Sequence, residues 1–240
     1  MKKISSLFVL LLSSISSILY GQQHQEVTLQ NFSKIDVQGI MQVELVKSKV
    51  NKVTSEALNG ANLEDLTVAV SGDELSVKTK IFKQLTDQNN NKKITGKKQF
   101  KITIEYTNEL AGIIAGRGVE LNADEALTGN HLVLDASSGA IVKLDINVNN
   151  LVVSSVQGAI VTLDGKAAFL QAKVNTGGEL FAYQLKSDEA DVKANTGGVA
   201  EISANNTLDA SASTGGTISY KGKPNQQTIK KTLGGEIHAN

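Results

Sequence analysis

A repeat of about nineteen residues constrains the fold of this chain more than any other sequence feature. Six glycines, each followed by a glycine or an alanine, recur with spacings of 19, 19, 20, 18 and 19 residues. They are Gly139, Gly158, Gly177, Gly197, Gly215 and Gly234. Self-similarity at a fixed period of this size is typical of a solenoid, in which each repeat packs against its neighbours.

The side chains on both sides of each glycine alternate between apolar and polar. Around Gly177, for example, Leu170, Ala172 and Val174 precede the glycine, and Leu180 and Ala182 follow it. Alternation with a period of two is strand periodicity. Because it continues across the glycine, we expect the glycine to mark a bend between two strands that keep the same side chains pointing inward.

The remaining residues of each repeat have the composition of loops, as in segments 163–167, 203–207 and 220–225. Residues at the same position of successive repeats are alike, and no repeat contains the signal of an antiparallel turn. This pattern predicts coils that stack in parallel. The predicted fold is therefore all-β, a right-handed parallel β-helix or β-solenoid with coils of about 19 residues. The alternative is an antiparallel sandwich with glycine-rich turns, which the regularity of the inward columns disfavours.

The first half of the chain has strands without the repeat. Segments 32–46 and 99–106 alternate apolar and polar residues, and segment 66–80 reads as a hairpin across Ser71, Gly72, Asp73 and Glu74. The polar segment 83–98 between them is expected to be a loop. We expect one domain over 22–240, in which 22–117 form strands that cap the solenoid and 118–240 form the regular repeats.

The first 21 residues predict a secretory signal peptide. Lys2 and Lys3 precede an apolar stretch over 4–19, and cleavage is expected near Gly21–Gln22. The alternative, a transmembrane anchor, is disfavoured because the stretch is short and rich in serine. No second apolar run of that length follows. The sequence therefore predicts export to the periplasm or the outer surface, with no transmembrane span after cleavage.

The overall charge and the absence of cysteine exclude several classes of protein. The chain has 24 basic and 24 acidic residues, and loss of Lys2 and Lys3 leaves 22 basic against 24 acidic ones. A nearly neutral chain gives no electrostatic reason to expect nucleic acid as a partner. Without cysteine there is no disulfide, no cysteine-based metal site and no cysteine for a lipid anchor.

Several short motifs follow one another in an order that resembles a known family. The order begins with Phe32, Ile35, Val37 and Gly39, spaced as F-x-x-I-x-V-x-G. Gly72, Leu75 and Val77 come next, then the glycine pairs, and then Tyr220, Gly222 and Pro224. Taken together they resemble the bacterial GIN-domain family, a putative auto-transporter adhesin head domain of unknown function in Bacteroidetes. The resemblance implies an exported envelope β-solenoid without catalytic residues; Gln157 and Leu233 depart from the Ser or Thr that usually precedes the glycine.

No motif for catalysis or for a cofactor is present. The three histidines, His24, His131 and His238, stand outside any recognisable catalytic pattern. Metal-binding and nucleotide-binding motifs are also missing from the sequence. We therefore expect no enzyme activity, no cofactor and no metal.

The best candidate for a binding site is a polar strip on the outward face of three consecutive repeats. If the coils stack in register, three columns of polar side chains run side by side. They are Gln171, Asp191 and Asp209; Lys173, Lys193 and Ser211; and Asn175, Asn195 and Ser213. Such a strip is either a ladder of solvated pairs, a site for a glycan, or the acidic and basic site of an enzyme that acts on an acidic polysaccharide with a cation.

Four outward positions in the early repeats are apolar, namely Ile141, Val152, Val156 and Ile160. We expect the N-terminal strands to cover them, the alternative being a partner interface. The leading functional hypothesis is an exported, non-enzymatic adhesin or scaffold that binds a cell-surface glycan or an envelope protein. The alternatives are a carbohydrate-active β-helix enzyme and an envelope structural or signalling protein that self-associates.

Overall fold

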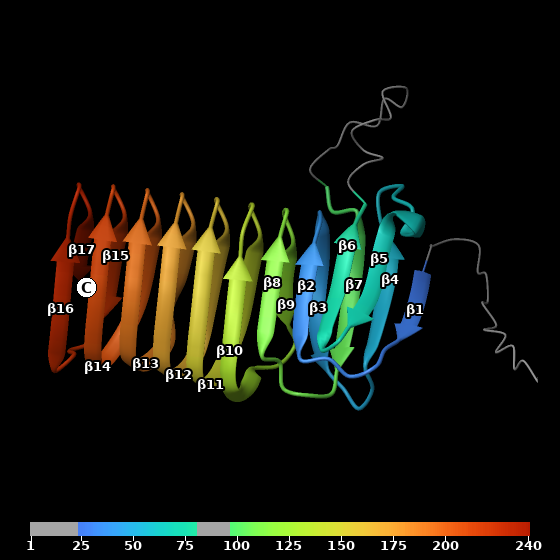
Figure 1. Ribbon diagram of the computed structural model, residues 1–240, viewed down its shortest axis with the longest axis horizontal. Coiled ribbons are helices and arrows are strands. Elements are labelled where there is room, and N and C mark those ends of the chain that lie inside the picture. Colours follow the sequence, from blue (N-terminus) through green and yellow to red (C-terminus); the bar gives the residue numbers. More distant parts are fainter. Residues whose placement is uncertain (1–23, 81–96) are drawn as a thin grey trace, which may run out of the picture.

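The computed structural model describes residues 24–80 and 97–240 as one long β-solenoid (Figure 1). The expected signal peptide, 1–21, lies outside the described residues, as does the expected loop at 83–98 apart from its last two residues. The described residues form seventeen strands, which join in one continuous sheet that winds around a single core. The only helical turn among the described residues is a short 3₁₀ helix, η1 (Leu63–Asp65), and no described helix is long and apolar enough to cross a membrane.

The regular part of the solenoid is built from parallel strands in register. The strands are β8 (Gly112–Gly116), β9 (Glu120–Ala123), β10 (Leu127–Ala136), β11 (Ile141–Val156), β12 (Ile160–Asn175), β13 (Glu179–Asn195), β14 (Val199–Ser213), β15 (Thr217–Lys221), β16 (Gln226–Lys231) and β17 (Glu236–Ala239). Val142 in β11 pairs with Val161 in β12, which pairs with Leu180 in β13. The predicted parallel stacking of coils about 19 residues long is therefore confirmed.

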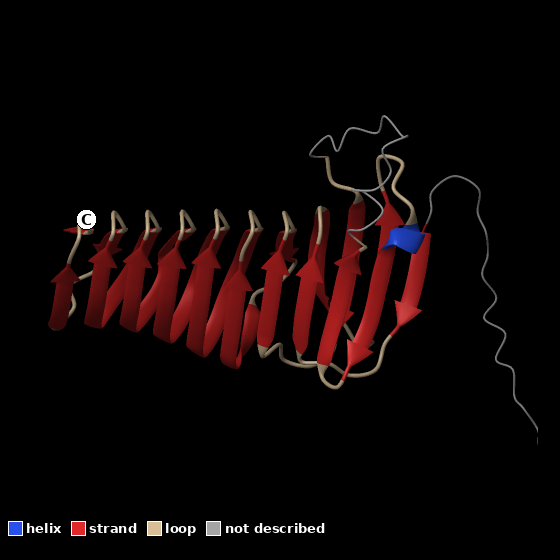
Figure 2. Ribbon diagram, turned by 45° about the horizontal axis from the view of Figure 1, so that its top comes forward, coloured by secondary structure: helices blue, strands red, loops and turns tan. Residues whose placement is uncertain are grey.

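Each glycine lies in a tight turn along one edge of the solenoid, where Figure 2 shows a row of short loops. In the turn between β12 and β13, Thr176 has φ 51° and Gly177 has φ 68°, so both residues adopt the left-handed conformation. Successive turns are joined by backbone hydrogen bonds, such as that from Gly177 N to Thr196 O at 3.2 Å. The residue after the glycine faces the core, so the bend keeps the inward side chains on one side, as predicted.

The prediction of a loop at the opposite edge is wrong for most coils. Segments 163–167 and 203–207 lie inside the continuous strands β12 and β14, and only segment 220–225 interrupts the strands, between β15 and β16. In β12 the chain bends while its pairing with β11 continues, whereas the pairing of β13 with β14 skips several residues at this edge. The varying repeat length appears instead as register shifts, for example between Ala182 and Lys186 in β13.

The coils have two faces, which we call the strip face and the opposite face. The strip face carries β6, β2, β8, β10, the second halves of β11 to β14, and β16. The opposite face carries β7, β3, β9, the first halves of β11 to β14, β15 and β17. Between them lie the inward columns, which are buried from the first turns to β15, as Leu134, Val161 and Ile202 illustrate.

The N-terminal strands continue the same stack. They are β1 (His24–Thr28), β2 (Lys34–Gln38), β3 (Met41–Lys47), β4 (Lys52–Ala57), β5 (Leu66–Ser71), β6 (Glu74–Thr79) and β7 (Phe100–Tyr106). The predicted hairpin is confirmed, since β5 pairs antiparallel with β6. At the end of the stack, β4 pairs antiparallel with β7 and with β1. The expected boundary at residues 117 and 118 falls in the turn between β8 and β9.

The order of the coils along the stack differs from their order in the sequence. β2 pairs in parallel with β6 on one side and with β8 on the other. β3 likewise pairs with β7 and with β9. Residues 34–47, the first coil in the sequence, therefore lie between the coil of β6 and β7 and the coil of β8 and β9, as Figure 1 shows for β6, β2 and β8.

Candidate binding surface

The nine residues of the predicted strip lie side by side on β12, β13 and β14. Lys173 is in register with Lys193, and Lys193 with Ser211. The other two columns follow the same register: Gln171, Asp191 and Asp209; and Asn175, Asn195 and Ser213. The geometry of the strip is thus as expected, with parallel neighbours about 4.8 Å apart. A ligand for the strip stays a prediction.

The strip has few contacts within itself, so most of its polar groups are available to a partner. Lys193 Nζ lies 3.5 Å from Asp191 Oδ2, and Ser213 Oγ donates a hydrogen bond of 2.5 Å to Asn195 Oδ1. Lys173 has no hydrogen bond or ion pair with any described residue, and its side chain is exposed. It therefore presents a free ammonium group in the middle of the strip.

Two oxygens of the strip are shielded without accepting a hydrogen bond from the described residues. They are Asn175 Oδ1 and Asp191 Oδ1, on neighbouring strands. A shielded acceptor that lacks a donor costs about 1–3 kcal/mol. Because both atoms are shielded, a ligand donor can reach them only if the two side chains turn outward.

The prediction that the N-terminal strands cover the outward apolar residues is wrong. Ile141 is 44% exposed, and Val152, Val156 and Ile160 are partly exposed. The four also lie on both faces, because Ile141 and Ile160 belong to the first halves of β11 and β12, whereas Val152 and Val156 belong to the second half of β11. The N-terminal strands cover neither group because their backbones pair with the end of the stack and so extend it along its axis.

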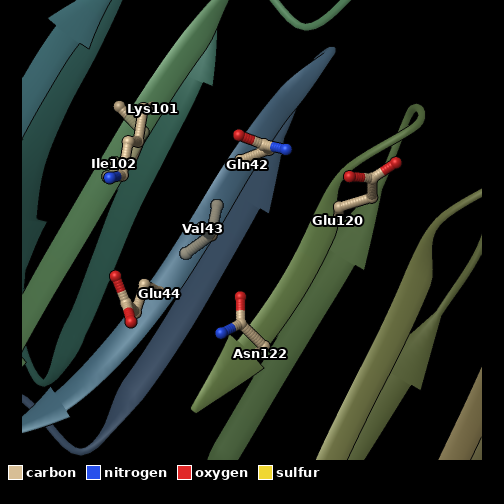
Figure 3. Close-up of a pocket in the computed structure, with 7 residues that line it drawn as sticks. All are labelled: Gln42, Val43, Glu44, Lys101, Ile102, Glu120 and Asn122. Atoms are coloured by element: carbon tan, nitrogen blue, oxygen red, sulfur yellow. The ribbon is translucent and has the colours of Figure 1, made fainter. Parts of the chain in front are cut away.

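The opposite face has a shallow hollow of about 200 Å³ that the sequence did not predict (Figure 3). Polar side chains from β3, β7 and β9 line it, namely Gln42, Glu44, Lys101, Glu120 and Asn122. Glu120 is held by Lys98, whose Nζ lies 2.9 Å from Glu120 Oε1. No sequence pattern could have joined these residues, since they come from three segments that meet only because β3 is inserted between β7 and β9.

Asp135, in register with Ser154 on the strip face, is an acid whose pKa is raised by its environment. Asp135 is exposed as a residue, but partial desolvation of its carboxyl raises its pKa, and a hydrogen bond with Ser154 partly offsets this. A carboxyl whose pKa is higher in the folded state binds its proton more tightly there. The contribution of Asp135 to stability is therefore fully present below its ordinary pKa of 3.8. It is lost as the pH rises through the higher pKa of the folded state.

Replacing Asp135 with asparagine is therefore expected to stabilise the protein at pH 7, because asparagine carries no charge to be desolvated. The gain should shrink as the pH falls toward 3, where the native carboxyl is protonated. Urea unfolding of both proteins at several pH values measures the difference. A gain for Asp135→Asn that is equal at pH 3 and pH 7 would contradict the role assigned to desolvation.

The described residues contain no group of three or more His, Cys, Asp or Glu side chains that could hold a metal ion. The strip brings Asp191 and Asp209 together, but their neighbours in the same column are Gln171 and Thr228.

The sequence pattern and this solenoid agree with one family of bacterial proteins. The model of the family described as "putative auto-transporter adhesin, head GIN domain" matches residues 31–224. The chain belongs to this family. The resemblance that the motif order indicated is thus confirmed, and the match spans both the inserted N-terminal coil and the strip. A search of curated proteins found no match to this GIN domain.

Crystal structures of other proteins share the fold of this GIN domain. A putative adhesin from Bacteroides fragilis is 21% identical, with a TM-score of 0.75, and the match covers 92% of this chain and 98% of that one. A putative adhesin from Parabacteroides distasonis is 18% identical, with a TM-score of 0.64 and coverage of 92% and 97%. A putative lipid binding protein from the same species is 16% identical, with a TM-score of 0.66 and the same coverage. At these identities the likeness establishes the fold alone.

Proposed function

We propose that this protein is exported and acts without catalysis, as a rigid scaffold that binds a cell-surface glycan or an envelope protein through the strip. The observation that carries the proposal is the strip itself: nine polar side chains from three strands in register on one face. The predicted signal peptide supports export, and the names of the family and of the similar structures support an adhesive role.

The scaffold favours binding because the strip is already ordered before a partner arrives. Each strip residue sits on a strand that is paired on both sides, so little backbone freedom is lost on binding. The free Lys173 ammonium suits a carboxylate or sulfate of the partner. The exposed side chains of Gln171 and Asp209 suit its hydroxyl or amide groups.

One similar structure is named a putative lipid binding protein. The strip of the present chain consists of amide, hydroxyl and charged side chains, which favour a polar ligand over an acyl chain. Of the exposed apolar residues, Val152 and Val156 are in register with Gln171 and Asn175 at the edge of the strip, whereas Ile141 and Ile160 lie on the opposite face. We therefore assign the binding role to the strip.

Replacing Lys173 and Lys193 together with alanine is expected to weaken binding by about tenfold or more. A charge-assisted hydrogen bond contributes about 1.5 kcal/mol or more, which corresponds to a factor of ten. A glycan array, followed by titration of the glycans that bind, measures the change. The matched control is Lys101→Ala with Lys143→Ala, which removes the same charge from the opposite face and should leave binding intact.

Equal binding by both double variants and the native protein would remove the strip from the proposal. The proposal that the protein acts without catalysis is tested separately, by incubating the native protein with uronate polysaccharides in the presence of calcium. We expect no cleavage. Turnover that disappears in Lys173→Ala with Lys193→Ala would identify the strip as a catalytic site instead.

A further inference from the structure

Strands β1 to β4 form an arm, residues 24–57, that packs into the rest of the protein as a separate piece. Within the arm the only strand pairing is that of β1 with β4. All its other pairings are with strands that come later in the sequence: β2 with β6 and β8, β3 with β7 and β9, and β4 with β7. The rest of the chain, from β5 onward, is called the body.

The body contains a gap one coil wide that the arm fills. The coil of β6 and β7 offers one edge and the coil of β8 and β9 offers the other. β2 pairs with both edges over its whole length, and β3 pairs with β7 over its whole length and with β9 over residues 42–45. The arm also supplies the core at this level with side chains that are no more than 2% exposed. They are Phe32, Ile35, Val37, Met41, Val43, Leu45 and Val53.

A single hinge, residues 58–65, joins the arm to the body. The hinge is folded back on itself, since Asn59 and Gly60 both have positive φ and residues Leu63–Asp65 form η1. Its contacts with the body include Leu58 N to Gln99 O at 2.8 Å and Asn59 Nδ2 to Lys98 O at 2.7 Å. Fully extended, eight residues reach roughly 26–29 Å, so the hinge can open and lead the arm away from its own body.

We propose that the arm is exchangeable, and that two copies of this chain form a dimer in which each arm fills the gap of the other body. Every strand pairing of the monomer recurs in such a dimer between the two chains. No new complementary surface is required, and the difference is confined to the hinge. Exchange of an identical element is a low-cost route to dimers, and here the exchanged element is an internal coil whose partners are distant in sequence.

The arm and body must find each other late in folding, and this favours exchange. The edges that hold β2 and β3 include β8 and β9, which end at Ala123, far along the chain from the arm. Until those strands form, the arm has apolar side chains and unpaired backbone edges exposed. A second chain folding nearby offers the same gap, so the choice between the two gaps depends on protein concentration.

A pair of cysteines across the gap distinguishes the two arrangements in the full chain, which has no cysteine of its own. Glu44 in the arm is in register with Asn122 in the body, and neither side chain bonds to another described residue. Parallel neighbours about 4.8 Å apart are within disulfide range. The variant Glu44→Cys with Asn122→Cys is unfolded with reductant, refolded at a series of concentrations, oxidised and run on a non-reducing denaturing gel.

We expect the ratio of intermolecular to intramolecular disulfide to rise in proportion to the refolding concentration. The matched control is Lys143→Cys with Thr162→Cys, register partners that both lie in the body, which should form only intramolecular disulfides. Dimers that associate through other surfaces would also show only intramolecular disulfides with the first pair. The two causes of dimerisation are therefore separable.

Shortening the hinge by deletion of residues 59–61 is expected to raise the dimer fraction at low concentration, because the arm then reaches its own gap less easily. Intramolecular disulfides alone, at every concentration and with either hinge length, would overturn the proposal. If the shortened chain does not fold, the concentration series with the native hinge is enough to decide whether the arms exchange.

Discussion

Replacing Gly165 with alanine is expected to cost about 3 kcal/mol or more of folding free energy. Gly165 lies in the bend of β12 with φ 103°, a conformation that residues with a side chain rarely adopt. An added Cβ would also lie 2.2 Å from Ile146 O of the preceding coil. The backbone strain and the overlap each cost roughly 1–3 kcal/mol. Urea unfolding followed by circular dichroism measures the loss.

The matched control is Gly158→Ala, at the opposite edge of the same coil. Gly158 also has a positive φ, 72°, but no atom lies within 4 Å of the position that a Cβ would take. We expect only the conformational penalty there, about 1 kcal/mol. Equal losses for the two variants would show that the close approach to Ile146 O is not what restricts position 165.

Replacing Leu45 with alanine is expected to cost about 2–5 kcal/mol, as for other buried leucines. Leu45 is fully buried in β3, where it is in register with Ile104 of β7 and with Ala123 of β9. The cavity would therefore open inside the inserted coil, between the N-terminal end and the regular repeats. Chemical unfolding gives the change in free energy.

The neighbouring Glu44 provides the control for this variant. Its side chain points outward from the same strand and bonds to no described residue, so Glu44→Ala should change stability by less than about 0.5 kcal/mol. A small loss for Leu45→Ala would mean that the inserted coil is a dispensable cover. A loss in the expected range would show that the inserted coil is packed as tightly as the rest of the core.

Much of the regular solenoid could be predicted because its rules are local. The period of the glycines gave the coil length, and the alternation of side chains gave the inward columns, since a strand exposes successive residues on opposite sides. The columns of the strip followed directly: Lys173 and Lys193 occupy equivalent positions and are in register. The hairpin of β5 and β6 was equally local, being marked by Gly72 and Asp73.

The inserted coil could not be predicted in this way. Segment 34–47 alternates like any other strand pair, and nothing in its pattern says that its partners are residues 74–79 and 112–116. The hollow lined by Gln42 and Glu120 was missed for the same reason. The prediction of a loop at 163–167 was wrong for a different reason. Gly165 lets the chain turn sharply while the strand pairing continues.

The sequence by itself determined the coil length, the inward face of the repeats up to β15 and the composition of the strip, because all three depend on positions within one repeat. Tertiary structure alone decided the order of the coils, the exposure of Ile141 and the hinge that carries the arm. The reason is that open strand edges accept any strand of suitable length and inward pattern. Which strand takes each edge depends on the pairing and burial of the whole chain at once.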